Sequence, residues 1–202
     1  MSRRRSFPWS RSTPAELRFP LEGPSVALRP FTLDDIPAAH LIYSDPEVMR
    51  WVGHGAVPSE AASGSIIRQY MAHQEAHGFA FWAVIERSTG TLIGDAGLAR
   101  TVGGDVEMGY TLRRAWWGRG LGTEAAGLCV AAARGPLGLP AVRALVEPPN
   151  AASRHVLEKL GFTEAGVTTA FGREHLVYRL DFGGEKQISP GSAGFRVARG
   201  GR

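Results

Sequence analysis

Three glycines at alternate positions, Gly118, Gly120 and Gly122, precede an alanine- and leucine-rich segment that is typical of a helix. Just before them, residues 106–112 alternate apolar with less apolar side chains, which predicts a strand. The first N–H groups of a helix have no partner within it, and the helix dipole favours negative charge there. Glycines also let the main chain approach a ligand without a Cβ in the way. This strand, turn and helix start therefore predict a site where main-chain N–H groups bind a diphosphate.

A second interpretation of the same glycines is a Rossmann dinucleotide site. The spacing Gly120-x-Gly122-x-x-Ala125 fits that fingerprint, and Glu147 ends the next predicted strand, where a ribose-binding acid would stand. However, residues 113–117 separate the strand from the glycines, and only about 60 ordered residues would remain for a doubly wound sheet. A Walker-type loop is excluded because no Gly-Lys-Ser/Thr follows. An NAD(P)-dependent oxidoreductase is thus the less favoured alternative.

The composition is that of an ordinary globular protein, with 202 residues, 44% hydrophobic and 21% charged, and this length suggests one domain. The single cysteine, Cys129, excludes an internal disulfide, and its place in a predicted helix favours packing over chemistry. No apolar run reaches the roughly 18 residues that span a membrane. The N-terminus has arginines but no apolar segment of a secretory signal, so we expect a cytoplasmic protein without a membrane partner.

The net charge of +4 comes from the ends of the chain. Residues 1–22 carry five Arg against two Glu, and residues 183–202 carry four Lys and Arg against one Glu, so the remainder sums to −2. We therefore expect a flexible basic arm over residues 1–22, one domain over residues 23–182 and a disordered basic tail over residues 183–202. The charge balance of the domain gives no support to a specific nucleic-acid-binding face.

Hydrophobic periodicity and turn residues predict the order of the elements. Strands are expected at residues 26–30, 79–85, 91–98, 106–112, 142–146 and 175–180, with a turn or strand at 162–167. Helices are expected at residues 33–43, 59–77, 121–133 and 150–160, capped by Thr32, Ser59 and Asn150 where side-chain oxygens can accept N–H bonds. The strands before the glycines form a meander rather than a βαβ repeat.

The histidines predict no metal centre. His73 and His77 have the i, i+4 spacing of a metal pair, but no third ligand is evident nearby, so surface histidines are the better interpretation. His54 lies in a glycine-flanked loop, where it is either solvated or part of a substrate pocket.

Three motifs in this order resemble the GCN5-related N-acetyltransferases (GNAT), in the branch that includes the ribosomal-protein N-terminal acetyltransferases. They are Glu107-x-Gly-Tyr110, the run from Trp117 to Ala125, and the run from Asn150 to Phe162. The resemblance covers about residues 24–182. It implies a mixed α/β fold with a mostly antiparallel sheet flanked by helices. That sheet would splay between the strands at 106–112 and 142–146, and acetyl-CoA would lie in the splay.

The resemblance also assigns residues to acetyl-CoA. Main-chain N–H groups around the diphosphate would come from Arg119, Gly120, Leu121, Gly122 and Thr123, with Thr123 adding a hydroxyl. The strand residues Tyr110, Thr111 and Leu112 would pair with the pantetheine arm, and such a strand N–H can stabilise a carbonyl oxygen that gains charge. Trp117 stands where the family has Gln or Arg, which main-chain binding tolerates. Arg113 and Arg119 could add positive charge.

Proton transfer is assigned to two side chains. Glu107 is the candidate base for the incoming amine, directly or through a water, and Glu147 is a second candidate. Ser153 would reach the departing sulfur, while Asn150 would bond the pantetheine amides. No Cys or Ser with a partnered His is evident, which argues against a covalent acetyl-enzyme.

The sequence therefore predicts an acetyl-CoA-dependent N-acetyltransferase that uses direct transfer in a ternary complex and needs no metal. The acceptor is a primary amine, either a protein N-terminal α-amine or a small molecule, and the protein is a monomer or homodimer. We expect residues 51–54 and the helix after Ser59 to line the acceptor pocket. The alternative that is not an enzyme is a catalytically silent acyl-CoA-binding or regulatory module with the same fold.

Overall fold

The computed structural model describes residues 17–183. A single eight-stranded sheet runs through this part of the chain, in the order β1-β2-β3-β4-β5-β6-β8-β7. Its strands are β1 (Leu21–Glu22), β2 (Val26–Arg29), β3 (Phe81–Glu86), β4 (Thr91–Arg100), β5 (Val106–Leu112), β6 (Ala141–Val146), β7 (Thr163–Ala170) and β8 (Arg173–Asp181).

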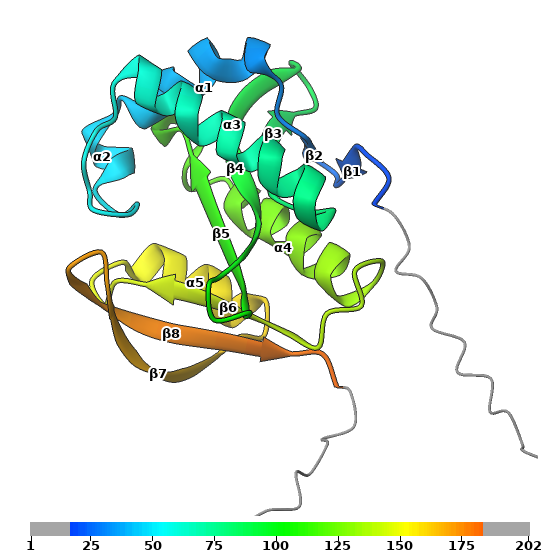
Figure 1. The fold of residues 1–202 in the computed structure, drawn as a ribbon, viewed down its shortest axis with the longest axis vertical. Coiled ribbons are helices and arrows are strands. Elements are labelled where there is room, and N and C mark those ends of the chain that lie inside the picture. Colours follow the sequence, from blue (N-terminus) through cyan, green and yellow to red (C-terminus); the bar gives the residue numbers. More distant parts are fainter. Residues whose placement is uncertain (1–16, 184–202) are drawn as a thin grey trace, which may run out of the picture.

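Neighbouring strands pair antiparallel everywhere except between β5 and β6. This parallel pair has a single register position, Glu107 opposite Arg143, and the two strands then diverge (Figure 1). Strands β1 to β5 form the meander, while β6, β8 and β7 form a second antiparallel group. The expected mostly antiparallel sheet with a splay between these two strands is confirmed. It also removes the Rossmann alternative, because a doubly wound sheet needs parallel strands joined by helices.

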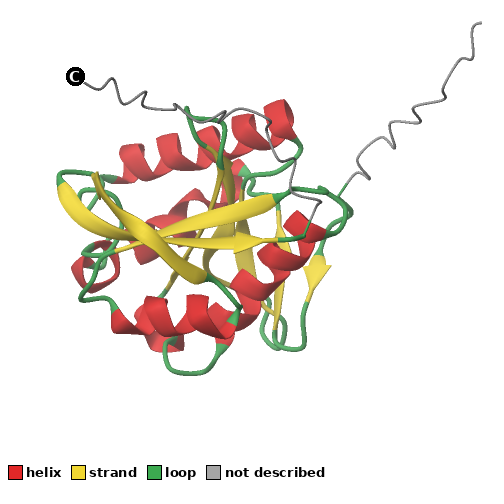
Figure 2. Cartoon of the chain, turned by 90° about the horizontal axis from the view of Figure 1, so that it is seen from below, coloured by secondary structure: helices red, strands yellow, loops and turns green. Residues whose placement is uncertain are grey.

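Helices cover both faces of the sheet (Figure 2). They are α1 (Ile36–Tyr43), α2 (Pro46–Met49), α3 (Glu60–His77), α4 (Leu121–Arg134) and α5 (Ala151–Lys159). Strand alternation separates two hydrophobic cores: in β3, Trp82 and Val84 pack with α4 and α5, whereas Ala83 packs with α1, α2 and α3. Among residues 17–183, no helix combines the length and apolarity that crossing a bilayer requires.

Local capping explains where the helices begin and end. The Ser59 hydroxyl accepts the Ala62 N–H at 3.2 Å, and α3 ends at Gly78, whose φ of 77° is the left-handed conformation that glycine tolerates. The expected helix over residues 33–43 begins instead with a 3-10 turn (Leu33–Asp35), and α1 follows it. Asp35 accepts the Thr32 N–H at 2.8 Å, and its two oxygens each accept a bond from Arg29 at 2.7 Å.

The sheet and its core include residues that the sequence pattern assigned to the N-terminal arm. Leu17 is buried, the ring of Phe19 lies 5.5 Å from that of Trp82, and β1 pairs with β2. Residues 17–22 were expected in the flexible arm, but these apolar contacts attach them to the sheet. The rest of the predicted arm, residues 1–16, and residues 184–202 of the predicted tail lie outside the described residues.

Candidate active site

The glycine turn after β5 leads directly into the first turn of α4. Gly118 and Gly120 have φ values of 74° and 78°, and a Cβ added to either would meet nothing within 4 Å. The first N–H of this turn to bond back is that of Glu124, to the Gly120 carbonyl at 3.1 Å. The N–H groups of Leu121, Gly122 and Thr123 therefore have no partner within the helix. This open cradle at a helix N-terminus fits a diphosphate.

Two guanidinium groups flank this turn. Those of Arg113 and Arg119 lie over the ring of Trp116, at 5.4 Å and 6.0 Å from its centroid. These cation–π contacts hold two positive charges beside the cradle, where they add to the helix dipole. The sequence analysis named both arginines but did not identify Trp116 as the aromatic ring that both guanidinium groups contact.

Gly122 has a packing role beyond main-chain access. A Cβ at this position would lie 3.0 Å from Cε2 of Tyr110, so a larger residue would require the ring to shift by a few tenths of an ångström. Burial raises the pKa of the Tyr110 hydroxyl, and a side-chain hydrogen bond with Ser153 lowers it. The Tyr110 side chain thus lies between the glycine turn, against Gly122, and Ser153, the serine that was predicted to serve the sulfur.

The register of β4 and β5 separates the three strand residues predicted to pair with pantetheine. Leu112 lies opposite Gly94, and the Arg113 N–H bonds the Ile93 carbonyl at 2.8 Å. Arg113 and Ile93 therefore form a hydrogen-bonded pair, and Leu112 with Gly94 is the adjacent non-hydrogen-bonded pair. In such a pair the main-chain N–H and C=O groups point away from the partner strand. Because the pattern alternates, the main chain of Thr111 bonds to β4 instead.

Tyr110 and Leu112 therefore direct their main-chain groups away from β4, on the side where β5 diverges from β6. The indole N–H of Trp117 bonds the Leu112 carbonyl at 2.7 Å, so Trp117 already occupies one acceptor position of this carbonyl. Trp117 stands where the family has Gln or Arg, and its indole acts here as a donor. The N–H of Leu112 and the N–H and carbonyl of Tyr110 remain for a ligand in the splay.

A buried polar cluster lies on the opposite face of β5. Asp95 is 1% exposed, and it accepts a bond from the Tyr43 hydroxyl at 2.7 Å. Burial raises the pKa of Asp95 to about 7, while hydrogen bonds from Tyr43 and Thr111 oppose the shift. Burial also raises the pKa of the neighbouring Tyr70 hydroxyl. Asp95 thus links β4 to α1 through Tyr43, and Thr111 lies directly opposite it on β5.

Asn150 caps α5, and the oxygen of its side-chain amide is occupied by this cap. Its Oδ1 accepts the Ser153 N–H at 3.1 Å, and both residues are half-buried. Since the oxygen serves the helix, the Nδ2 group is the part of Asn150 that can donate to a ligand. The structure places Asn150 and Ser153 together just beyond the C-terminal end of β6.

Glu107 lies where β5 and β6 last pair. Its Oε2 lies 3.4 Å from Nη2 of Arg143, whose Nη1 also contacts Asp105 at 3.1 Å. Burial raises the pKa of Glu107, and the positive charges of Arg143 and, more weakly, His175 lower it. A carboxylate with a raised pKa is better suited to accept a proton near neutral pH.

His175 is a functional candidate that sequence reasoning missed. It is 5% exposed, and its Nδ1 lies 3.1 Å from the Arg173 carbonyl. A carbonyl can only accept, so Nδ1 carries a hydrogen and donates it to the Arg173 carbonyl. The sequence signal for His175 was only a histidine at the start of a predicted strand, and nothing local indicated its electrostatic effect on Glu107.

Glu147, the second candidate base, is engaged in an ion pair. Its Oε1 contacts Nη1 of Arg173, and its side chain is 13% exposed. The same guanidinium bonds the carbonyls of Arg50 and Gly53 in the loop between α2 and α3. In that loop, the ring of His54 lies 5.4 Å from that of Phe171 in the turn between β7 and β8. The structure therefore brings residues 51–54 to the ends of β6 and β8.

The remaining candidates have structural roles. Cys129 is fully buried in α4, and burial raises the pKa of its thiol. The rings of His73 and His77 are 4.4 Å apart, and Nε2 of His73 accepts the Arg100 N–H at 3.2 Å. Within residues 17–183, no group of three or more His, Cys, Asp or Glu residues could hold a metal ion.

Comparison with protein families gives a match over most of the chain. Residues 25–163 match the family described as "Acetyltransferase (GNAT) domain". A protein of Bacillus subtilis (strain 168) named "Uncharacterized N-acetyltransferase YoaA" is 32% identical over 150 residues, which are 73% of this chain and 84% of that protein.

Solved structures agree in fold. An acetyltransferase from Agrobacterium tumefaciens str. C58 is 26% identical with a TM-score of 0.70, covering 81% of this chain and 96% of that one. Mycobacterium smegmatis RimJ, solved in complex with CoA-disulfide, is 22% identical with a TM-score of 0.67, covering 83% of this chain and 85% of that one.

Proposed function

Because the chain belongs to the GNAT acetyltransferase family, we propose that it moves an acetyl group from acetyl-CoA to a primary amine by direct transfer in a ternary complex. The observation that carries this proposal is the divergence of β5 and β6 after their single pairing at Glu107 and Arg143. The divergence leaves the main chain of Tyr110 and Leu112 directed away from β4, with the open turn at Gly120 at the far end of β5.

The residues present fit acetyl-CoA at both ends of this site. The N–H groups of Leu121, Gly122 and Thr123, with that of Arg119, would hold the diphosphate, and the hydroxyl of Thr123 would add a donor. The strand groups of Tyr110 and Leu112 and the Nδ2 of Asn150 would hold the pantetheine amides. Bound in this way, acetyl-CoA supplies an activated thioester carbon. RimJ of Mycobacterium smegmatis, which shares the fold, was solved with CoA-disulfide.

Glu107 is the proposed general base. The amine must lose a proton before its nitrogen attacks the thioester carbonyl, and burial raises the pKa of this carboxyl toward the working range. The neighbouring Arg143 opposes that shift. The carboxylate accepts the proton directly or through one water.

Ser153 is the proposed proton donor at the sulfur. A C–N bond forms, the C–S bond breaks and the electron pair leaves with the sulfur, so the departing thiolate takes a proton. The Ser153 hydroxyl then regains its proton from water, because burial raises the pKa of Tyr110 and keeps that phenol protonated. The products are the N-acetyl amine and CoA, with no covalent acetyl-enzyme.

The acceptor is proposed to enter from the side of the α2–α3 loop and the start of α3. Residues 51–54 lie there, within reach of the turn between β7 and β8. The acceptor is an amine, either the α-amine of a protein or peptide or the amine of a small molecule. We place the reaction in the cytoplasm, in a monomer or homodimer.

Two measurements on the purified protein test this proposal. Titration calorimetry with acetyl-CoA and with CoA should show binding, and NAD(H) should give no heat. Transfer of isotopic acetyl from acetyl-CoA should then be measured on a panel of peptides with a free α-amine, the same peptides with a blocked α-amine, free amino acids, polyamines and aminoglycosides. Absence of heat with acetyl-CoA would refute the proposal.

A silent acyl-CoA-binding module would bind acetyl-CoA but give no product with any amine. Separate replacements distinguish the two functions. Glu107→Gln and Ser153→Ala should each slow turnover at least about tenfold while leaving acetyl-CoA affinity within about twofold, since general acid–base groups typically contribute about 100-fold or more. Equal losses of turnover and affinity would contradict the assigned roles.

A further inference from the structure

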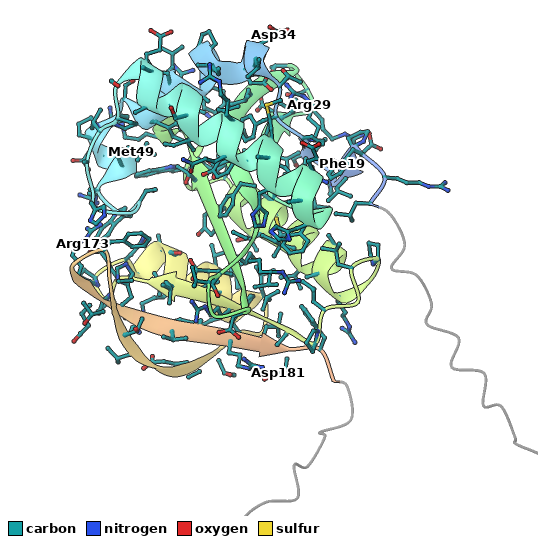
Figure 3. The ribbon with its side chains drawn as sticks, in the orientation of Figure 1. Phe19, Arg29, Asp34, Met49, Arg173 and Asp181 are labelled. Atoms are coloured by element: carbon teal, nitrogen blue, oxygen red, sulfur yellow. The ribbon has the colours of Figure 1, made fainter. Side chains whose placement is uncertain are left out.

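The Arg173 side chain joins three segments that are far apart in the sequence. It extends from the first residue of β8, where Figure 3 shows it on the same side of the molecule as Met49 at the end of α2. Its Nη1 donates to the Arg50 carbonyl at 2.8 Å, its Nη2 donates to the Gly53 carbonyl, and Nη1 also contacts Oε1 of Glu147. One guanidinium therefore holds the α2–α3 loop, the end of β6 and the start of β8.

The position of these contacts is what gives them a functional meaning. Glu147 directly follows β6, the strand that diverges from β5, and so marks the open end of the splay. The loop held by Arg173 contains residues 51–54, on the side where the amine is proposed to enter. The T-shaped contact of His54 and Phe171 also joins the α2–α3 loop to the turn between β7 and β8.

The choice of arginine fits this task. A guanidinium is planar and offers five N–H donors in a fixed fork, so it can serve two carbonyls and a carboxylate at once. Glu147, whose side chain is 13% exposed, neutralises the half-buried cation. A lysine would keep the charge near Glu147 but, as a flexible point charge, could not hold both carbonyls in a fixed geometry.

We propose that Arg173 is a positioning residue that fixes the α2–α3 loop against the ends of β6 and β8, and so sets the affinity for the acceptor amine. This inference rests on the proposed acetyl transfer. Arg173 acts through the loop that it holds, and Glu147 serves as its counter-ion rather than as a catalytic base.

Arg173→Lys is the informative variant, because truncation to alanine would leave Glu147 buried without a partner and could unfold the protein. With the best acceptor of the amine panel, the KM for the amine should rise about tenfold, as expected for loss of one to two charge-assisted hydrogen bonds. The KM for acetyl-CoA should stay within about twofold. Arg179→Lys is the matched control: it lies on the same strand, pairs with Asp181 and is exposed, and its kinetics should not change.

An unchanged KM for the amine in Arg173→Lys would overturn the inference, and so would an equal rise in both KM values, which indicates a general structural defect. Hydrogen exchange separates this inference from the proposed function, since it needs no acceptor. The amides of residues 50–55 should exchange faster in Arg173→Lys than in the wild type or Arg179→Lys. Unchanged exchange would overturn the proposal that Arg173 fixes the α2–α3 loop, even if acetyl transfer is found. Faster exchange would support that role of Arg173 even if no acetyl transfer is found.

Discussion

The buried carboxyl of Asp95 should make folding stability depend on pH in a direction opposite to that of most carboxylates. Asp95 is 1% exposed in the middle of β4, and its pKa is raised from 3.8 to about 7, chiefly by burial. The perturbation is Asp95→Asn, which keeps the shape and an oxygen that can accept from Tyr43 but removes the titration.

The sign follows from proton linkage. A carboxyl with a higher pKa in the folded state binds its proton more tightly there, so ionisation favours the unfolded state. The wild type therefore loses stability relative to Asp95→Asn as the pH rises from 3.8 to about 7, and the difference is constant above that. Three pKa units at about 1.4 kcal/mol each give a total loss of about 4 kcal/mol.

Urea unfolding of the wild type and Asp95→Asn at a series of pH values measures this difference, and the titrations that the two proteins share cancel. Between pH 5 and pH 8 the free energy of unfolding of the wild type should fall by about 3 kcal/mol relative to the variant. A difference that stays constant within about 0.5 kcal/mol would refute the reasoning. Tyr43→Phe provides a second check: it removes a donor that lowers the pKa of Asp95, so the loss should extend to higher pH.

Three further predictions concern the candidate site. Gly120→Ala should destabilise the protein by about 1–2 kcal/mol, because φ is 78°, and should weaken acetyl-CoA binding in calorimetry; an unchanged melting temperature would contradict the left-handed conformation. Trp117→Phe removes the bond to the Leu112 carbonyl and should cost at most about 1 kcal/mol in urea unfolding, whereas Trp117→Gln, which keeps a donor, should cost less. Arg143→Gln removes the charge that holds down the pKa of Glu107, so the acid limb of kcat/KM against pH should move to higher pH; a limb that moves to lower pH, or one that persists in Glu107→Gln, would argue against Glu107 as the base.

Elements with strong local signals were predictable from the sequence. The strand at residues 106–112 was predicted with the bounds that β5 has, and the caps at Ser59 and Asn150 mark the starts of α3 and α5. Such features arise from bonds between residues within one turn of chain, so the local sequence suffices to encode them. The motif around Gly120 carried the family resemblance in the same way, and the family match confirms it.

Strand β7 had a weaker signal. Residues 163–169 are all exposed and show no alternation of apolar and polar side chains. The sequence therefore indicated only a turn or strand over residues 162–167. An edge strand of this kind is defined by its pairing with β8, which runs from Thr163 opposite Arg179 to Ala170 opposite Arg173. Periodicity reports burial of one face, and here no face is buried.

The sequence by itself determined the order of the elements, the glycine turn and the family, and hence the acetyl-transfer chemistry. Only the tertiary structure decided which main-chain groups of β5 point away from β4, and that Glu147 is paired with Arg173. The Arg173 guanidinium donates hydrogen bonds to the carbonyls of Arg50 and Gly53, which lie more than a hundred residues away in the sequence. Alternation along a strand fixes which side chains share a face, but the partner that covers the face depends on packing between distant segments, which no local pattern encodes.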